Sequence, residues 1–368
     1  MGGKILCPFC FKKMPKNALE YVCTSQRCQK IITNAKPNRY GIVRCSCGHN
    51  TTTRRCPECH RILPNNILDG NTHIISIVGG ASCGKSYFVA TLIKQIMYNA
   101  LLVPFGNIAV KWGISASRDE YITRFKNNLD HFIPLRGTQY VTDVVKDNPP
   151  ILIEMTRNER GLFGSHLVSD TFSFFDAAGE SFEDADKLAS ITPYIQHSEA
   201  VVLILDPRQV EFVNHAVTTA MPNLPPVSDR TYAEILSNTV QILRSYAETF
   251  NPLNRKIKIP LCIAFSKWDL LLNTPGLLPD GMNVSDPVQL SGKYDESLCA
   301  AISEELRALL MKWEPTLVIM AEGEFEVVRY FAFSAWGTSD TGGRGAPPIA
   351  SYRVEDPMLW VMRREKII

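Results

Sequence analysis

Long apolar runs are missing from this chain. No stretch of about 18 or more apolar residues occurs, which is the length that a membrane-spanning helix requires. The first seven residues hold no apolar segment of the kind that a secretion signal needs, and position 6 is Leu where an N-myristoylation signal has Ser or Thr. We therefore expect a cytoplasmic protein without a transmembrane segment.

Acidic residues are scarce in the first 68 residues, and cysteine is scarce in the rest. This region contains twelve Lys and Arg but only two acidic residues, Glu20 and Glu58, so its net charge is +10. Because the whole chain has a net charge of +2, the other 300 residues have a net charge of −8. Eight of the eleven cysteines lie before residue 60. Without a secretion signal, such clustering favours metal binding over disulfides.

The length bounds the number of domains. A chain of 368 residues is too long for one ordinary domain of about 100–150 residues and short for three. With 45% hydrophobic and 21% charged residues the composition is globular, which excludes wholesale disorder. We expect a small cysteine-rich module over residues 1–62, a turn-rich linker over 63–72 and a main domain over 73–368, with no internal repeats.

The N-terminal cysteines form four closely spaced pairs. Two thiolates separated by a short gap can reach one tetrahedral ion at about 2.3 Å, so two four-cysteine zinc sites would use all eight. Four protein ligands leave no open position for chemistry, which makes both sites structural. The pairs are Cys7 with Cys10, Cys23 with Cys28, Cys45 with Cys47, and Cys56 with Cys59.

Spacing alone leaves the grouping of the pairs open. The simple assignment is sequential, and an interleaved one joins the first pair to the third and the second to the fourth. With few large apolar side chains, the module depends on metal binding worth on the order of 10 kcal/mol per site. Two four-thiolate centres of about −2 each lower the module's charge to about +6, which suits either a protein partner or nucleic acid.

A phosphate-binding pattern opens the main domain. The β-branched run His73–Val78 reads as a buried strand, and an apolar segment of helical length follows from Tyr87 to Tyr98. Between them lies G-x4-G-K-S, in which backbone N–H groups face phosphates, the Lys reaches the β- and γ-phosphates and the Ser ligates Mg2+. The pattern comprises Gly79, Gly80, Ala81, Ser82, Cys83, Gly84, Lys85 and Ser86.

Polar motifs follow four further predicted strands. The strand 170–175 is followed by Asp176 and Gly179, where the Asp can hold Mg2+ and the Gly lets a backbone N–H reach a γ-phosphate. The strands 200–205 and 259–265 come next, and the latter is followed by Ser266-Lys267-Trp268-Asp269. The strand 327–333 is followed by Ser334-Ala335.

In this order the motifs resemble the signature segments of Ras-like, translation-factor-class P-loop GTPases, over residues 73–337. The resemblance implies an α/β fold with a mainly parallel sheet flanked by helices, preceded here by a zinc-ribbon module. It implies that Lys267 packs on the base, that Asp269 accepts two hydrogen bonds from guanine, and that a backbone N–H near Ala335 meets guanine O6. Ser266 departs from the usual Asn or Thr. GTP or GDP with Mg2+ is the expected ligand.

The resemblance also implies switch and catalytic residues. Thr138, with Thr142 as the alternative, is expected to close on Mg2+ and the γ-phosphate, and Arg136 is a candidate arginine finger in cis. Glu180 stands where relatives often carry a water-orienting Gln, and its charge repels the γ-phosphate. GTP hydrolysis is therefore expected to be slow without an activator.

A narrower resemblance and two rival functions complete the expectations. The D-x-A-G-E and P-x-L-W segments are similar to those of bacterial double-GTPase families associated with biological conflict, although this chain supplies one GTPase unit. One rival is a zinc-dependent nucleic-acid-binding protein gated by the P-loop domain. The other is an ATPase or kinase, against which Asp269 and Ser334-Ala335 argue.

The first prediction concerns metal content. Because eight thiolates complete two tetrahedral sites, purified protein should carry about two zinc ions per chain. Elemental analysis measures this directly. Less than about one zinc per chain, or free reaction of all the thiols without denaturant, would contradict the assignment.

Overall fold

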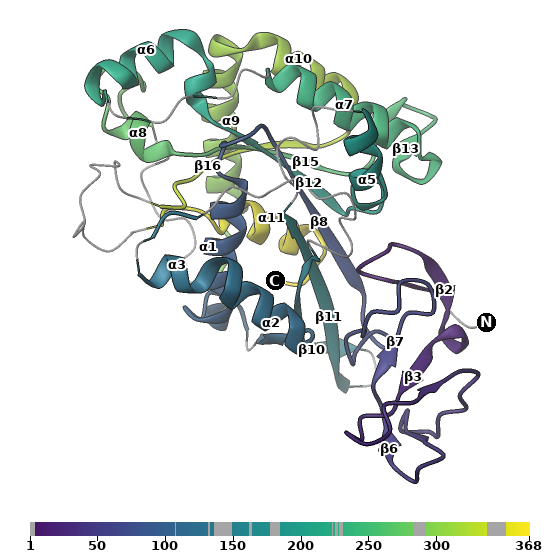
Figure 1. Cartoon of the computed structure of the whole chain (residues 1–368). Coiled ribbons are helices and arrows are strands. Elements are labelled where there is room, and N and C mark those ends of the chain that lie inside the picture. Colours follow the sequence, from purple (N-terminus) through teal and green to yellow (C-terminus); the bar gives the residue numbers. More distant parts are fainter. Residues whose placement is uncertain are drawn as a thin grey trace.

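The computed structural model describes most of the chain (Figure 1). It covers residues 4–368 apart from 107, 132, 136–148, 162–163, 177–184, 223, 225–226, 228–230, 283, 285–291 and 337–350. Among the described helices, none combines the length and the apolar character needed to cross a membrane.

A seven-stranded sheet forms the centre of the main domain, and the predicted α/β class is confirmed. Its order is β16-β15-β12-β8-β11-β10-β9. The first five of these strands run parallel, and β10 and β9 add two antiparallel pairings at one edge. The strands are β8 (Thr72–Val78), β9 (Ala109–Trp112), β10 (Ile151–Gly161), β11 (Gly164–Asp176), β12 (Ala200–Leu205), β15 (Leu261–Phe265) and β16 (Val328–Ala332).

Helices cover both faces of the sheet, as Figure 1 shows. Successive strand residues point to opposite sides, so Ile74 packs with one layer of helices and Ile75 with the other. One layer comprises α5 (Ala185–Gln196), α6 (Glu211–Ala220), α7 (Tyr232–Arg244), α8 (Trp268–Leu272), α9 (Glu296–Trp313) and α10 (Pro315–Glu324). The other comprises α1 (Lys85–Met97), α2 (Ser115–Tyr121), α3 (Asn127–Asp130) and α11 (Asp356–Arg364).

Some elements differ from the sequence-based expectation. The helix expected near 117–131 is present, but α2 and α3 are joined by a π-helical segment, Ile122–Lys126. The edge strand β9 and the helices α6 and α10 were not predicted. The helix α9 ends at Trp313, just before Pro315. Pro315 then begins α10, because proline is tolerated in the first turn of a helix.

Small strands and short turns build the N-terminal module. Its sheets pair β1 with β2, β5 with β6, and β3 with both β4 and β7. These strands are β1 (Lys4–Leu6), β2 (Lys13–Pro15), β3 (Glu20–Val22), β4 (Ile31–Ile32), β5 (Val43–Arg44), β6 (Asn50–Thr51) and β7 (Arg54–Arg55). The remaining short elements are η1 (Lys16–Ala18), η2 (Val103–Phe105), η5 (Pro207–Gln209), η6 (Ala247–Thr249), β13 (Phe250–Asn251) and β14 (Lys256–Ile257).

The module packs directly on the main domain. Leu63 and Ile67, from the segment expected to be a linker, are buried with Phe9 of the module and Leu152 of β10 in one cluster. Asn66 donates a side-chain hydrogen bond of 3.0 Å to the backbone carbonyl of Ser169 in β11. The segment 63–72 therefore forms part of an interface in this structure, and the module lies beside β10 and β11 in Figure 1.

The second prediction concerns this interface. A Cβ atom on Gly70 would lie 1.5 Å from the backbone carbonyl oxygen of Ser169, so Gly70→Ala must push the segment away from β11. We expect a fall in melting temperature of several degrees, corresponding to about 1–3 kcal/mol. Gly323→Ala is the matched control, because a Cβ there meets nothing within 4 Å and alanine suits the helix α10. Equal melting temperatures of the two variants would contradict the close approach.

Candidate nucleotide site and metal centres

Two groups of four cysteines gather in the N-terminal module. The outer cysteine group contains Cys7, Cys10, Cys56 and Cys59, and the inner cysteine group contains Cys23, Cys28, Cys45 and Cys47. Within each group the sulfur atoms all lie within 4.8 Å of one another.

The sulfur spacing fits zinc and not disulfides. The Sγ–Sγ distances are 3.8 Å for Cys7–Cys59, 3.7 Å for Cys10–Cys56, 3.5 Å for Cys23–Cys47 and 3.7 Å for Cys28–Cys45. A tetrahedron with Zn–S bonds of about 2.3 Å has sulfur–sulfur edges of about 3.8 Å, whereas a disulfide would bring the atoms to about 2.0 Å. The backbone N–H of Cys47 lowers the pKa of the Cys45 thiol to about 6, which favours the thiolate that a metal needs.

The predicted groupings of the cysteine pairs, sequential and interleaved, are both wrong. The structure nests them, with the first pair joined to the fourth and the second to the third. The reason is a long-range strand pairing: Glu20 and Tyr21 of β3 lie opposite Arg55 and Arg54 of β7. Because β3 and β7 pair, the turn that holds Cys56 and Cys59 lies next to the turn that holds Cys7 and Cys10. The other two cysteine pairs lie in the stretch of chain between these two turns.

The phosphate-binding pattern forms a tight loop between β8 and α1. Lys85 is only 5% exposed, and its Nζ donates to the carbonyl oxygens of Gly79, at 3.0 Å, and Gly80, at 2.7 Å. A Cβ on Gly79 would lie 2.7 Å from the carbonyl oxygen of Ile204, so the loop approaches β12 too closely for any other residue. Burial raises the pKa of the Cys83 thiol, which stays protonated and fills space inside the loop.

Two of the three predicted magnesium ligands, Ser86 and Asp176, lie together. Asp176 ends β11, which runs parallel to β8, and Ser86 lies in the first turn of α1, directly after Lys85. The Ser86 hydroxyl donates to Asp176 Oδ1 at 3.2 Å, and the Asp176 carboxylate is almost fully buried. Asp176 Oδ2 accepts a hydrogen bond of 2.8 Å from the Arg124 guanidinium, which sequence reasoning missed.

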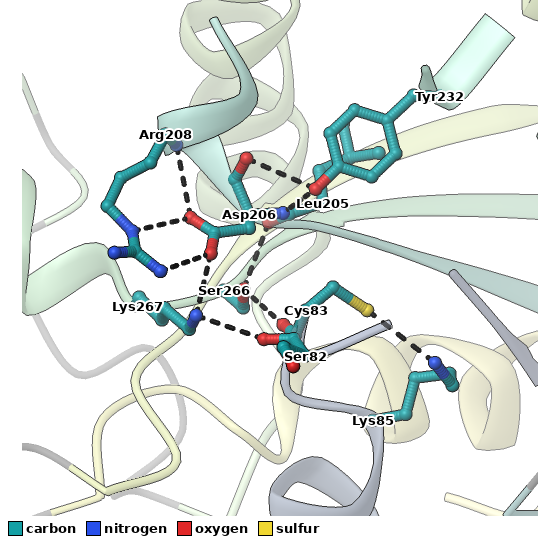
Figure 2. Close-up of polar contacts among 9 residues, drawn as sticks. All are labelled: Ser82, Cys83, Lys85, Leu205, Asp206, Arg208, Tyr232, Ser266 and Lys267. Atoms are coloured by element: carbon teal, nitrogen blue, oxygen red, sulfur yellow. Dashed lines mark hydrogen bonds and ion pairs between the residues drawn. The ribbon is translucent and has the colours of Figure 1, made fainter. Parts of the chain in front are cut away.

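The segment after β15 ties itself to the phosphate-binding loop (Figure 2). The Ser266 hydroxyl lies 2.6 Å from the carbonyl oxygen of Cys83, and Lys267 Nζ donates to the carbonyl oxygen of Ser82 at 3.0 Å. Lys267 adopts a left-handed backbone conformation, φ +52°, which turns the chain into α8. Ser266, the departure from the usual motif, thus has a defined contact.

A buried ion cluster supports Lys267, and its acidic member was also missed. Asp206, directly after β12, accepts from Lys267 Nζ at 2.6 Å and from the Arg208 guanidinium at 2.8 Å. Burial disfavours the charged form of Asp206, but Lys267 and Arg208 outweigh this effect and hold the pKa of the carboxyl below its ordinary value. The sequence did hold a signal for Asp206. It is a polar residue that directly follows an apolar strand, at the same edge of the sheet as the other motifs.

Ser334 orients Asp269. Its hydroxyl donates to Asp269 Oδ1 at 2.7 Å and accepts from the backbone N–H of Asp269 at 2.8 Å. Thr91 of α1 donates to the carbonyl oxygen of Ala335 at 3.2 Å, and the fully buried Trp268 anchors the start of α8. The expected base-binding residues therefore lie together, next to the phosphate-binding loop.

Several predicted residues lie outside the described part of the chain. These are Arg136, Thr138, Thr142, Gly179 and Glu180. The predicted roles of these residues as switch and catalytic groups stay predictions.

Comparison with known proteins gives weak similarities in sequence and in fold. No protein-family model matches the chain. The sequence is 26% identical over 317 residues to a putative ESX-1 scaffolding and assembly protein, SaeC, of Mycolicibacterium smegmatis, covering 83% of this chain and 78% of that protein.

Similar solved structures include small GTPases. The Arl6 (BBS3) small GTPase of Trypanosoma brucei is 11% identical, with 80% of this chain and 98% of that one covered, at a TM-score of 0.30. The GTP-bound GTPase-like domain of Ski7 from S. cerevisiae is 13% identical, with 81% and 51% covered, at 0.32. TM-scores this low do not support a fold assignment. The class of the fold rests on the strand order of the sheet and on the geometry of the phosphate-binding loop. Those define a Ras-like P-loop fold joined to a cysteine module that fits a zinc ribbon.

The third prediction tests the nested grouping. In the nested arrangement the double variant Cys7→Ser/Cys59→Ser damages one metal site and should keep about one zinc per chain. Cys7→Ser/Cys23→Ser damages both sites and should keep close to none. Elemental analysis of the two variants distinguishes the arrangements, since a sequential grouping reverses the two results.

Proposed function

We propose that this protein is a GTP-binding and GTP-hydrolysing switch whose cysteine module binds two zinc ions and docks a protein partner. One observation carries the proposal. Residues from four different segments are tied together at the carboxyl ends of parallel strands, where α/β domains of this type bind ligands. They are Lys85 and Ser86, Asp176, Lys267 and Asp269, and Ser334 with Ala335.

The residues present fit a magnesium-bound nucleotide. The helix α1 begins at Lys85 directly after the glycine-rich loop, so its N-terminal N–H groups and its dipole favour phosphate. Ser86 and the buried Asp176 offer oxygen atoms of the kind that Mg2+ prefers. When bound, Mg2+ would neutralise phosphate charge, and Lys85 would exchange its loop carbonyls for phosphate oxygens.

The base preference follows from Asp269. An ionised carboxylate only accepts hydrogen bonds, and guanine presents two donors, N1–H and the 2-amino group, whereas adenine presents none on that edge. Ser334 donates a hydrogen bond to Oδ1 of Asp269, which limits the movement of this carboxylate. Guanine is therefore the base that this carboxylate selects.

Contacts between the module and α5 support a role of the module in sensing the nucleotide state. Its Phe11 ring lies 5.7 Å from the ring of Tyr194 in α5, and Tyr194 Oη accepts a hydrogen bond of 3.0 Å from the backbone N–H of Phe175. These contacts flank residues 177–184, the segment expected to respond to the γ-phosphate through Gly179. Arg136, Thr138 and Glu180 complete the proposed hydrolytic machinery, and the charge of Glu180 supports slow turnover without an activator.

A protein partner is favoured over nucleic acid. The similarity to a protein described as an ESX-1 scaffolding and assembly protein supports a role in bringing proteins together. The positive charge of the module would also suit nucleic acid, but no comparison supports that partner. A place in a bacterial conflict or defence system, and a cytoplasmic location, stay predictions.

The fourth prediction tests the nucleotide assignment. GTP should compete for the site roughly a hundredfold better than ATP, because two charge-assisted hydrogen bonds to Asp269 are worth about 1.5–3 kcal/mol each. Lys85→Ala should abolish binding in a folded protein, and Asp269→Asn should shift preference towards XTP, which carries a carbonyl in place of the amino group. Competition against fluorescent GDP measures the nucleotide preference of the wild type and the nucleotide binding of both variants.

Asp295→Asn is the matched control for Asp269→Asn. Asp295 is exposed at the N-cap of α9, where asparagine caps equally well, so this variant should keep the wild-type preference. Equal competition by ATP and GTP in the wild type would replace the guanine assignment by an ATPase.

A further inference from the structure

Arg124 lies on the carboxylate that the magnesium ion needs. Its NH2 atom is 2.8 Å from Asp176 Oδ2, while Ser86 Oγ lies 3.2 Å from Oδ1 of the same group. The Asp176 side chain is only 2% exposed and that of Arg124 is 20% exposed, so the carboxylate end of this contact lies out of bulk water. Such a partly buried, charge-assisted pair is stronger than a surface ion pair.

The position of Arg124 is built into the fold. It belongs to the π-helical segment Ile122–Lys126, and such segments often occur at functional sites. Tyr121, just before it, donates to the carbonyl oxygen of Ala90 at 3.0 Å, which fixes the segment against α1. The guanidinium lies 4.7 Å from the centre of the Phe125 ring and 3.7 Å from Glu120.

We propose that Arg124 is a built-in counter-ion that competes with Mg2+ for Asp176. A buried carboxylate without a cation is costly, and Arg124 supplies that cation when no metal is bound. A guanidinium on Oδ2 disfavours a divalent ion at the same carboxylate, because like charges repel whether Mg2+ binds directly or through water. Completing the metal site is therefore more favourable when Arg124 leaves Asp176. This inference rests on the proposed nucleotide site.

The exchange would reach a segment ahead of the predicted switch. The π-helical segment continues into α3, and the chain then runs to Leu135, whose backbone N–H donates to the hydroxyl of Tyr87 at 2.9 Å. Displacement of Arg124 from Asp176 would act on this described stretch, which precedes the predicted switch residue Thr138 in the sequence.

The experiment measures magnesium dependence rather than hydrolysis. The Mg2+ concentration for half-maximal retention of fluorescent GDP is determined for the full zinc-loaded chain and for Arg124→Gln, which keeps much of the stem and loses the charge. We expect Arg124→Gln to need about tenfold less Mg2+, the scale of one charge-assisted hydrogen bond. Arg124→Lys, which keeps a positive charge, should fall between the variant and the wild type.

Controls separate this inference from the nucleotide assignment. Arg118→Gln, on the same helix but 57% exposed and paired with Asp119, should match the wild type. An unchanged or higher Mg2+ requirement in Arg124→Gln, with circular dichroism showing a folded protein, overturns the competition. The titration is repeated with ADP: retention of ADP instead of GDP refutes the guanine preference while the magnesium shift still decides Arg124. Retention of neither nucleotide by the wild type overturns both.

Discussion

The site depends on hydrogen bonds to the carbonyl oxygens of the phosphate-binding loop. Lys85 holds the carbonyls of Gly79 and Gly80, and residues after β15 hold those of Ser82 and Cys83. A loop whose carbonyls are engaged on one side has its N–H groups turned to the other, which is where an anion binds. The contacts from Ser266 and Lys267 come from a segment about 180 residues away, so they hold the proposed base region against the proposed phosphate region.

The Asp206 cluster shows how this alignment is stabilised. Arg208 is only 1% exposed, and its partner Asp206 also binds Lys267. Removing Asp206 would take away the carboxylate that pairs with the buried Arg208 guanidinium, which is more costly than the loss of a surface pair. The cluster therefore has a structural role that would fix the lysine of the base segment. Tyr232 extends the cluster into α7 by donating to the carbonyl oxygen of Asp206 at 3.1 Å.

Sequence reasoning recovered the parts of the fold that local signals determine. The run 200–205 reads as a strand because every residue is apolar, and the loop before Lys85 is recognisable because Gly79 and Gly84 adopt positive φ angles that favour glycine. The cysteine grouping could not be derived, because it depends on the distant pairing of β3 with β7. Arg124 could not be found either, because nothing around it in sequence reveals that its helix packs against α1 and points it at Asp176.

The outer cysteine group connects the module to the nucleotide site. Phe11 follows Cys10 directly and adopts a left-handed conformation, φ +60°, held by a hydrogen bond of 3.0 Å from its N–H to the carbonyl oxygen of Cys7. That turn places the ring on Tyr194 of α5. A non-glycine residue keeps a left-handed conformation only where the surrounding structure enforces it. Four cysteines bound to one ion would provide that constraint next to Phe11. A metal in the outer group would therefore fix the surface against which α5 packs. The inner group lies in the chain between the two turns of the outer group, so a metal there would shape the part of the module that remains for a partner.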